Sequence, residues 1–83
     1  MSNSHLDFLI QTLLRINSAD EMHEFLLGIF TPQELVEIPT RLEIVKKLKN
    51  GVAQHKIADD LGVGVATVTR GSKELQKGRF KNI

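Results

Sequence analysis

Between Gln54 and Leu75 the sequence reads QHKIADDLGVGVATVTRGSKEL, with apolar residues at the spacing of two short helices. The spacing predicts one helix over roughly 54–61 and a second over 65–75. Gly62 falls between them, where a residue without a Cβ can take the positive φ that ends a helix and turns the chain. The stretch therefore predicts two helices joined by a tight turn.

The apolar residues of this stretch predict how the two helices pack. Ile57, Leu61 and Val68 have the spacing to meet across a steep helix crossing. Ala58 is small at the position where the second helix would pass close by. This arrangement is typical of a helix-turn-helix motif. A helical hairpin that only packs is the alternative interpretation.

Short side chains occupy the start of the second helix, which favours close approach to base edges in the major groove of DNA. Thr67 would offer a hydroxyl to a base or a phosphate, and Ala66 would meet a thymine methyl group. Lys56, Lys73 and the basic residues after Gln76 would contact phosphates. The residues expected to face DNA are Gln54, His55, Lys56, Gly64, Val65, Ala66, Thr67, Thr69 and Lys73.

The net charge of +1 conceals an uneven distribution along the chain. Residues 1–40 carry one basic and six acidic side chains, whereas residues 41–83 carry ten basic and four acidic ones. A basic half is suited to a polyanion such as DNA. An ordinary solvated surface with uneven charge is the alternative.

Helical spacing continues toward the N-terminus of the chain. Two segments, Ser18–Glu21 and Thr31–Glu34, have the residue types and spacing of a capping box. Pro39 follows inside the third helical pattern, where we expect a kink or a break with a restart. The basic tail, residues 77–83, is predicted to fray. We expect an all-α protein with a single domain over residues 1–83.

Composition excludes several classes of protein. The chain has no cysteine, which removes disulfides, thiolate metal sites and cysteine nucleophiles. No apolar run approaches the length of a membrane span, and no secretory signal is recognisable, so we expect a cytoplasmic protein. The three histidines lack metal-ligand spacing, and no nucleophile with a base and an orienting group is visible, so neither a metal site nor an enzyme is expected. A core this small favours oligomerisation.

Three sequence motifs resemble the Trp repressor family. They are Thr31-Pro32, Thr40-Arg41 and the run LGVGVATVTRGS over residues 61–72. The resemblance implies a small intertwined helical homodimer, with residues 1–50 forming the dimerising and ligand-supporting helices. Residues 53–75 would form the helix-turn-helix head that binds a palindromic operator in double-stranded DNA.

The resemblance also implies control by L-tryptophan as corepressor. Arg41 and Arg70 would flank the indole, and Arg70 with Thr31 would hold the carboxylate. The main-chain carbonyls of Gly28 and Phe30 would accept from the ammonium group. The remaining residues implied in the ligand site are Gly71, which would let the ring lie close, and Glu74. No other cofactor is expected.

The chain departs from the family pattern at four places. Glu74 replaces a serine that meets the ligand ammonium, and Pro39 replaces a glycine before Thr40-Arg41. The segment from Gly51 to Gly62 is one residue shorter than in the tryptophan-sensing members, and no long last helix precedes Ile83. The DNA-facing residues match better than the ligand residues do.

The sequence thus predicts a sequence-specific DNA-binding repressor controlled by L-tryptophan or a related small ligand. Two alternatives stay open. One is a helix-turn-helix module that binds DNA without a ligand. The other is a helical protein-interaction domain that does not bind DNA.

Overall fold

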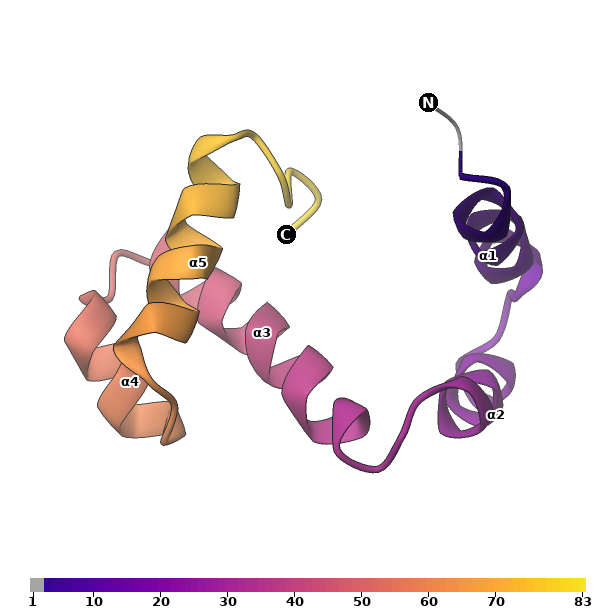
Figure 1. Cartoon of the computed structure of the whole chain (residues 1–83), viewed down its shortest axis with the longest axis horizontal. Helices are drawn as coiled ribbons and strands as arrows, with labels where there is room; N and C mark the ends of the chain where they lie inside the picture. Colours follow the sequence, from indigo (N-terminus) through magenta and orange to yellow (C-terminus); the bar gives the residue numbers. More distant parts are fainter. Residues whose placement is uncertain (1–2) are drawn as a thin grey trace. The chain divides into compact units, whose positions relative to one another are not determined.

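In a computed structural model that describes residues 3–83, all regular structure is helical. The five helices are α1 (Ser4–Arg15), α2 (Ala19–Ile29), α3 (Glu34–Lys49), α4 (Gln54–Leu61) and α5 (Val65–Gln76) (Figure 1). The all-α prediction is therefore confirmed. The chain divides into two compact units, one that ends at Leu35 and one that runs Val36–Ile83. Among residues 3–83, none of the helices combines the length and apolar character needed to cross a bilayer.

Side chains cap the first three helices. Asn3 accepts hydrogen bonds from backbone amides in the first turn of α1, and the hydroxyl of Ser18 accepts one from the amide of Glu21 in α2. Thr31 and Glu34 form a reciprocal pair. The Glu34 amide donates to Thr31 Oγ1 at 3.1 Å, and the Thr31 amide donates to Glu34 Oε1 at 2.9 Å. This confirms the capping box predicted before α3.

The first unit leaves much apolar surface uncovered. Neither α1 nor α2 contains a buried residue. The side chains of Phe8 and Leu14 are 67% and 79% exposed. A helix with an uncovered apolar face is typical of one that packs against another chain.

Helix α3 continues through Pro39. Of the two expected outcomes, the break does not occur, because α3 is one helix from Glu34 to Lys49, and the kink stays a prediction. Because proline has no backbone N–H, the carbonyl of Leu35, four residues earlier, loses its usual hydrogen bond in the helix. Pro39 is exposed, and Thr40 donates its hydroxyl to the Val36 carbonyl at 2.7 Å in the same turn.

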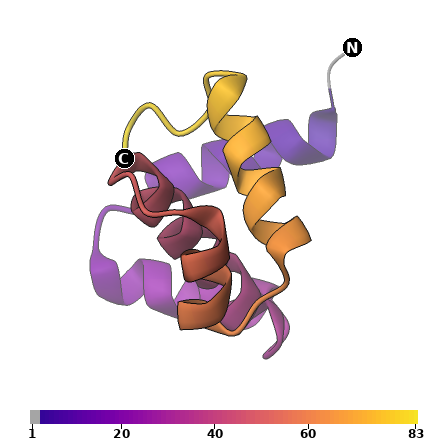
Figure 2. The same cartoon turned by 90° about the vertical axis from the view of Figure 1, so that its left-hand side faces the viewer.

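The core of the second unit joins α3, α4 and α5. Its five buried side chains are each 5% exposed or less: Ile44, Val45, Ile57, Ala58 and Val68. Leu61 packs against this core while partly exposed. Burying one aliphatic side chain of this size contributes about 1.5–3 kcal/mol. The predicted packing of α4 on α5 is confirmed, and Figure 2 shows the two helices side by side, joined by the turn.

Gly62 makes the turn between α4 and α5. Its φ of 66° and ψ of 36° are left-handed, as predicted. The amides of Gly62 and Val63 both donate to the carbonyl of Ala58, which closes the end of α4. Gly64 does not need this freedom, because its φ is −71°.

The prediction that the tail after α5 frays is wrong, because the tail is held by contacts with α3. The ammonium of Lys49, at the end of α3, donates to the carbonyls of Phe80 and Ile83. The Ile83 amide in turn donates to the Phe80 carbonyl at 3.3 Å. These contacts lie outside any helix pattern, which is why periodicity did not reveal them.

Candidate functional site

Helices α4 and α5, with the turn at residues 62–64, form the helix-turn-helix motif. Unlike the first three helices, neither has a side-chain cap. Ala53 precedes α4 and Gly64 precedes α5, and neither residue has a side chain that could accept from the first turn. Uncapped amides at a helix N-terminus can bind phosphate oxygens.

Most residues predicted to face DNA lie on the surface. Gln54 and Thr69 are half-buried. The exposed members are His55, Lys56, Gly64, Val65, Ala66, Thr67 and Lys73. Their arrangement leaves the N-terminal half of α5 accessible, as reading a groove requires.

Two of these residues bind each other. The hydroxyl of Thr69 donates to Gln54 Oε1 at 2.9 Å, which links α5 to the start of α4.

Lys56 lies 3.2 Å from a carboxylate oxygen of Asp60, one turn later in α4, and stays 64% exposed. An exposed ion pair of this kind contributes only about 0–1 kcal/mol, so it would readily open toward a phosphate.

A cavity of about 190 Å³ lies between α3, α5 and the tail. Its lining is Arg41, Ile44, Val45, Thr67, Arg70, Gly71, Glu74 and Phe80. The structure thus brings together four residues of the predicted ligand site: Arg41, Arg70, Gly71 and Glu74. The walls combine an apolar floor with charged side chains at the rim, a common composition for a small-molecule site.

Gly71 lies on the side of α5 that faces α3. A Cβ placed on Gly71 would lie 3.3 Å from Ile44 Cγ2 and 3.6 Å from Leu48 Cδ1. The first distance is tighter than an ordinary van der Waals contact. Gly71 therefore permits the helix contact as well as lining the cavity, and only the second role was predicted.

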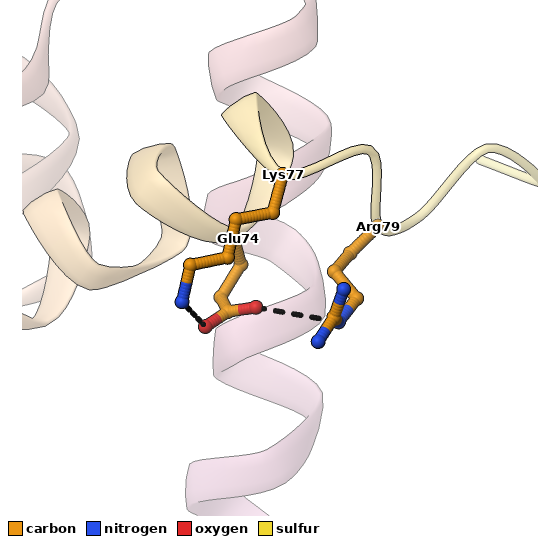
Figure 3. A network of polar contacts seen from close by, with 3 residues as sticks. All are labelled: Glu74, Lys77 and Arg79. Carbon is orange, nitrogen blue, oxygen red and sulfur yellow. Dashed lines mark hydrogen bonds and ion pairs between the residues drawn. The ribbon is translucent and has the colours of Figure 1, made fainter.

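Glu74 forms two ion pairs at the edge of the cavity (Figure 3). Its Oε1 lies 3.4 Å from Lys77 Nζ, and its Oε2 lies 3.5 Å from Arg79 Nε. Each carboxylate oxygen therefore has a cationic partner. The Glu74 carboxylate, which stands where the family has a serine that meets the ligand ammonium, is therefore paired with cations of this chain.

Three residues of the predicted ligand site belong to the first unit. Gly28 lies in α2, Phe30 follows that helix, and Thr31 caps α3. Thr31 Oγ1 accepts from Glu34, so its hydroxyl proton is still available to an anion. The part that these three residues take in the site stays a prediction.

Four residues that line the cavity were absent from the predicted ligand site: Ile44, Val45, Thr67 and Phe80. Phe80 was assigned to a fraying tail, and Thr67 was assigned to DNA alone. Gly78 is the sequence feature that could have indicated the position of Phe80. Its φ of 90° turns the chain back at the end of α5. In addition, Arg41 and Thr67 line a second, more open hollow of about 450 Å³ that reaches the turn at residues 61–64.

The fold and site define a small helix-turn-helix protein with a cavity against its second motif helix. A comparison with protein families identifies the chain further. The model of the family described as "Trp repressor protein" matches residues 4–82. The chain belongs to the Trp repressor family, a family of transcription regulators and not of enzymes.

Curated relatives agree with this assignment. A "Trp operon repressor homolog" of Xylella fastidiosa (strain M23) is 32% identical over 77 residues, covering 92% of this chain and 84% of the relative. One of Vibrio campbellii is 41% identical over 69 residues, covering 81% and 69%. One of Vibrio cholerae is 47% identical over 58 residues, covering 68% and 56%. No solved structure matches the chain significantly.

Proposed function

We propose that this chain is a homodimeric repressor that binds a palindromic operator in double-stranded DNA. The single observation that carries the proposal is the exposed N-terminal half of α5, presented by a helix-turn-helix motif within the basic half of the chain. The uncapped amides of α4 and α5, together with Lys56 and Lys73, supply phosphate contacts around it.

The uncovered apolar faces support the dimer. Large apolar side chains on α1, such as Phe8 and Leu14, are mostly exposed within one chain. A second copy supplies a matching apolar surface, because the contact in a two-fold dimer uses the same patch from both chains. Two reading heads related by this axis would face two half-sites of a palindrome.

The cavity supports control by a small molecule that carries a carboxylate, with L-tryptophan as the first candidate. Arg41 and Arg70 place two guanidinium groups at its rim, and a guanidinium suits both a carboxylate and an aromatic face. The acid at this rim, Glu74, is already paired with Lys77 and Arg79. The remaining charge at the cavity is therefore positive and favours the carboxylate group of a ligand.

Shared wall residues suggest how a ligand would affect the head. Arg41 and Thr67 line both the ligand cavity and the open hollow beside the turn at residues 61–64. A ligand that fixes these side chains would bias the orientation of α5 toward the binding-competent state. The coupling is reciprocal, so operator DNA would raise the affinity for the ligand by the same factor.

The test is selection of duplexes from a random pool by the purified protein, with and without L-tryptophan. We expect an enriched palindrome and weaker binding as salt rises, because lysine–phosphate contacts release counterions. Enrichment that needs L-tryptophan supports the corepressor. The same palindrome without any ligand identifies a ligand-independent module, and no salt-dependent duplex binding at all would contradict the repressor.

A further inference from the structure

The end of α5 aims the chain back toward the cavity. The amide of Gly78 donates to the Leu75 carbonyl at 3.0 Å, and the amide of Arg79 donates to the Glu74 carbonyl at 3.1 Å. With φ of 90° at Gly78, these two bonds form the Schellman arrangement that ends many helices. The direction in which residues 78–83 leave α5 is thus set by local backbone geometry.

Phe80 reaches the cavity from this segment. It is half-buried and lines the same space as Arg41 and Gly71. Its φ of 62° is left-handed, which is unusual for a bulky residue and persists only where surrounding contacts hold it. Lys49 supplies such a contact, because its ammonium donates to the carbonyls of Phe80 and Ile83.

A second contact holds the segment from the side of α5. Arg79 pairs with Glu74, which is itself part of the cavity wall (Figure 3). Lys77 pairs with the same carboxylate, but it caps α5 and does not belong to the returning segment. The segment thus has two anchors: Lys49 holds it from the end of α3, and Arg79, within the segment, holds it to Glu74 of α5.

We propose that residues 78–83 form a clasp, in which Phe80 is an aromatic wall of the ligand site and Lys49 and Arg79 hold that wall closed. This inference rests on the proposed function of the cavity as a ligand site. The ligand it fits carries a carboxylate and an apolar ring. The carboxylate faces Arg41 and Arg70, and the ring packs against Phe80 and the aliphatic floor. Glu74 acts as a positioning residue for the clasp and not as the acceptor of a ligand ammonium.

The closed clasp can be tested without any ligand. The chain contains no tryptophan, so Phe80→Trp introduces a single emitting residue at the clasp. In this background, Lys49→Gln with Arg79→Gln removes both anchors. The matched control is Lys46→Gln with Lys81→Gln, which removes the same charge from the last turn of α3 and from the returning segment.

We expect the anchor variant to shift the emission of the residue at position 80 to longer wavelength. Its quenching by acrylamide should rise at least about twofold, because neither the Lys49 hydrogen bonds nor the Arg79–Glu74 ion pair would then hold position 80 against the cavity. The control should match the parent. Equal quenching in the anchor variant and the control would overturn the clasp. So would a Phe80→Trp parent whose emission acrylamide quenches as strongly as that of a fully exposed tryptophan.

The role of Phe80 as a wall is tested with L-tryptophan as the probe. Phe80→Ala should weaken binding about tenfold, because the ring loses an aromatic partner, whereas Lys81→Ala in the same segment should not. Unchanged or tighter binding by Phe80→Ala would overturn the wall. Absence of binding by the unmodified protein would instead contradict the proposed ligand, and the acrylamide experiment would then decide the clasp.

Discussion

The hydroxyl of Thr69 in α5 donates to the side-chain oxygen of Gln54 at the start of α4, with 2.9 Å between the two atoms. The bond joins the two helices of the motif at the end where α4 begins. It orients two side chains that the sequence assigned only to DNA. A fixed angle between the helices is what a reading head needs in order to keep its register on a groove.

Thr69→Val tests this link. The substitution keeps the shape of the side chain and removes the donor, so the free energy of unfolding should fall by about 0.5–1.5 kcal/mol. Thr69→Ser keeps a hydroxyl and should lose less. Urea unfolding at one fixed protein concentration measures both. Equal stability of the valine and serine variants would show that the hydrogen bond contributes nothing.

Gly71→Ala tests the close approach of α5 to α3. The new methyl would lie 3.3 Å from Ile44 Cγ2, so either α5 or the Ile44 side chain must move. Overpacking of this kind costs about 1–3 kcal/mol, whereas alanine in place of a helical glycine gains about 0.5–1 kcal/mol. Gly28→Ala is the matched control, because a Cβ at Gly28 meets no atom within 4 Å. We therefore expect Gly71→Ala to unfold at a lower temperature than Gly28→Ala, and equal thermal stability of the two variants would contradict the tight contact.

Ile10→Glu tests the dimer. Ile10 is 45% exposed within one chain and carries the apolar side of α1. Burying an unpaired carboxylate between two copies is costly, so we expect the variant to sediment as a monomer. Gln11→Glu places the same charge on an exposed polar residue next to it and should remain dimeric. If Ile10→Glu and Gln11→Glu sediment with the same mass, the dimer contact does not involve the apolar side of α1.

Thr67→Ala and Lys73→Gln separate base reading from phosphate contact. Once an operator is selected, Thr67→Ala should reduce discrimination against random DNA by about 1–3 kcal/mol if its hydroxyl reads a base. Lys73→Gln should weaken binding to both duplexes alike and lower the salt slope by about 1. Equal weakening on both duplexes by Thr67→Ala would limit Thr67 to the backbone or to the cavity that it lines.

The helix-turn-helix was predictable because its determinants are local. Ile57, Ala58 and Val68 follow helical periodicity, and Gly62 marks the one position between the helices that needs a positive φ. The helix ends at 54, 61 and 65 agree with the structure. Local signals of this kind need no knowledge of the rest of the chain.

The tail and Pro39 could not be predicted in the same way. Phe80 reaches the cavity through contacts with Lys49, which lies 31 residues earlier, and periodicity carries no information about such pairs. Proline usually ends or kinks a helix, yet α3 continues to Lys49. Pro39 removes only one hydrogen-bond donor, and its exposed position leaves the unpaired carbonyl accessible to water. Likewise, only tertiary structure reveals that Glu74 is paired with Lys77 and Arg79.

The most direct test of the account is a titration with L-tryptophan followed by the ligand's own fluorescence. The protein has no tryptophan and no tyrosine, so excitation at the red edge of indole absorption reports only the ligand. We predict a saturable rise in anisotropy that is lost in Arg41→Ala and Arg70→Ala, because these guanidinium groups line the cavity. A flat titration, or saturation unchanged in both variants, would contradict tryptophan binding in this cavity.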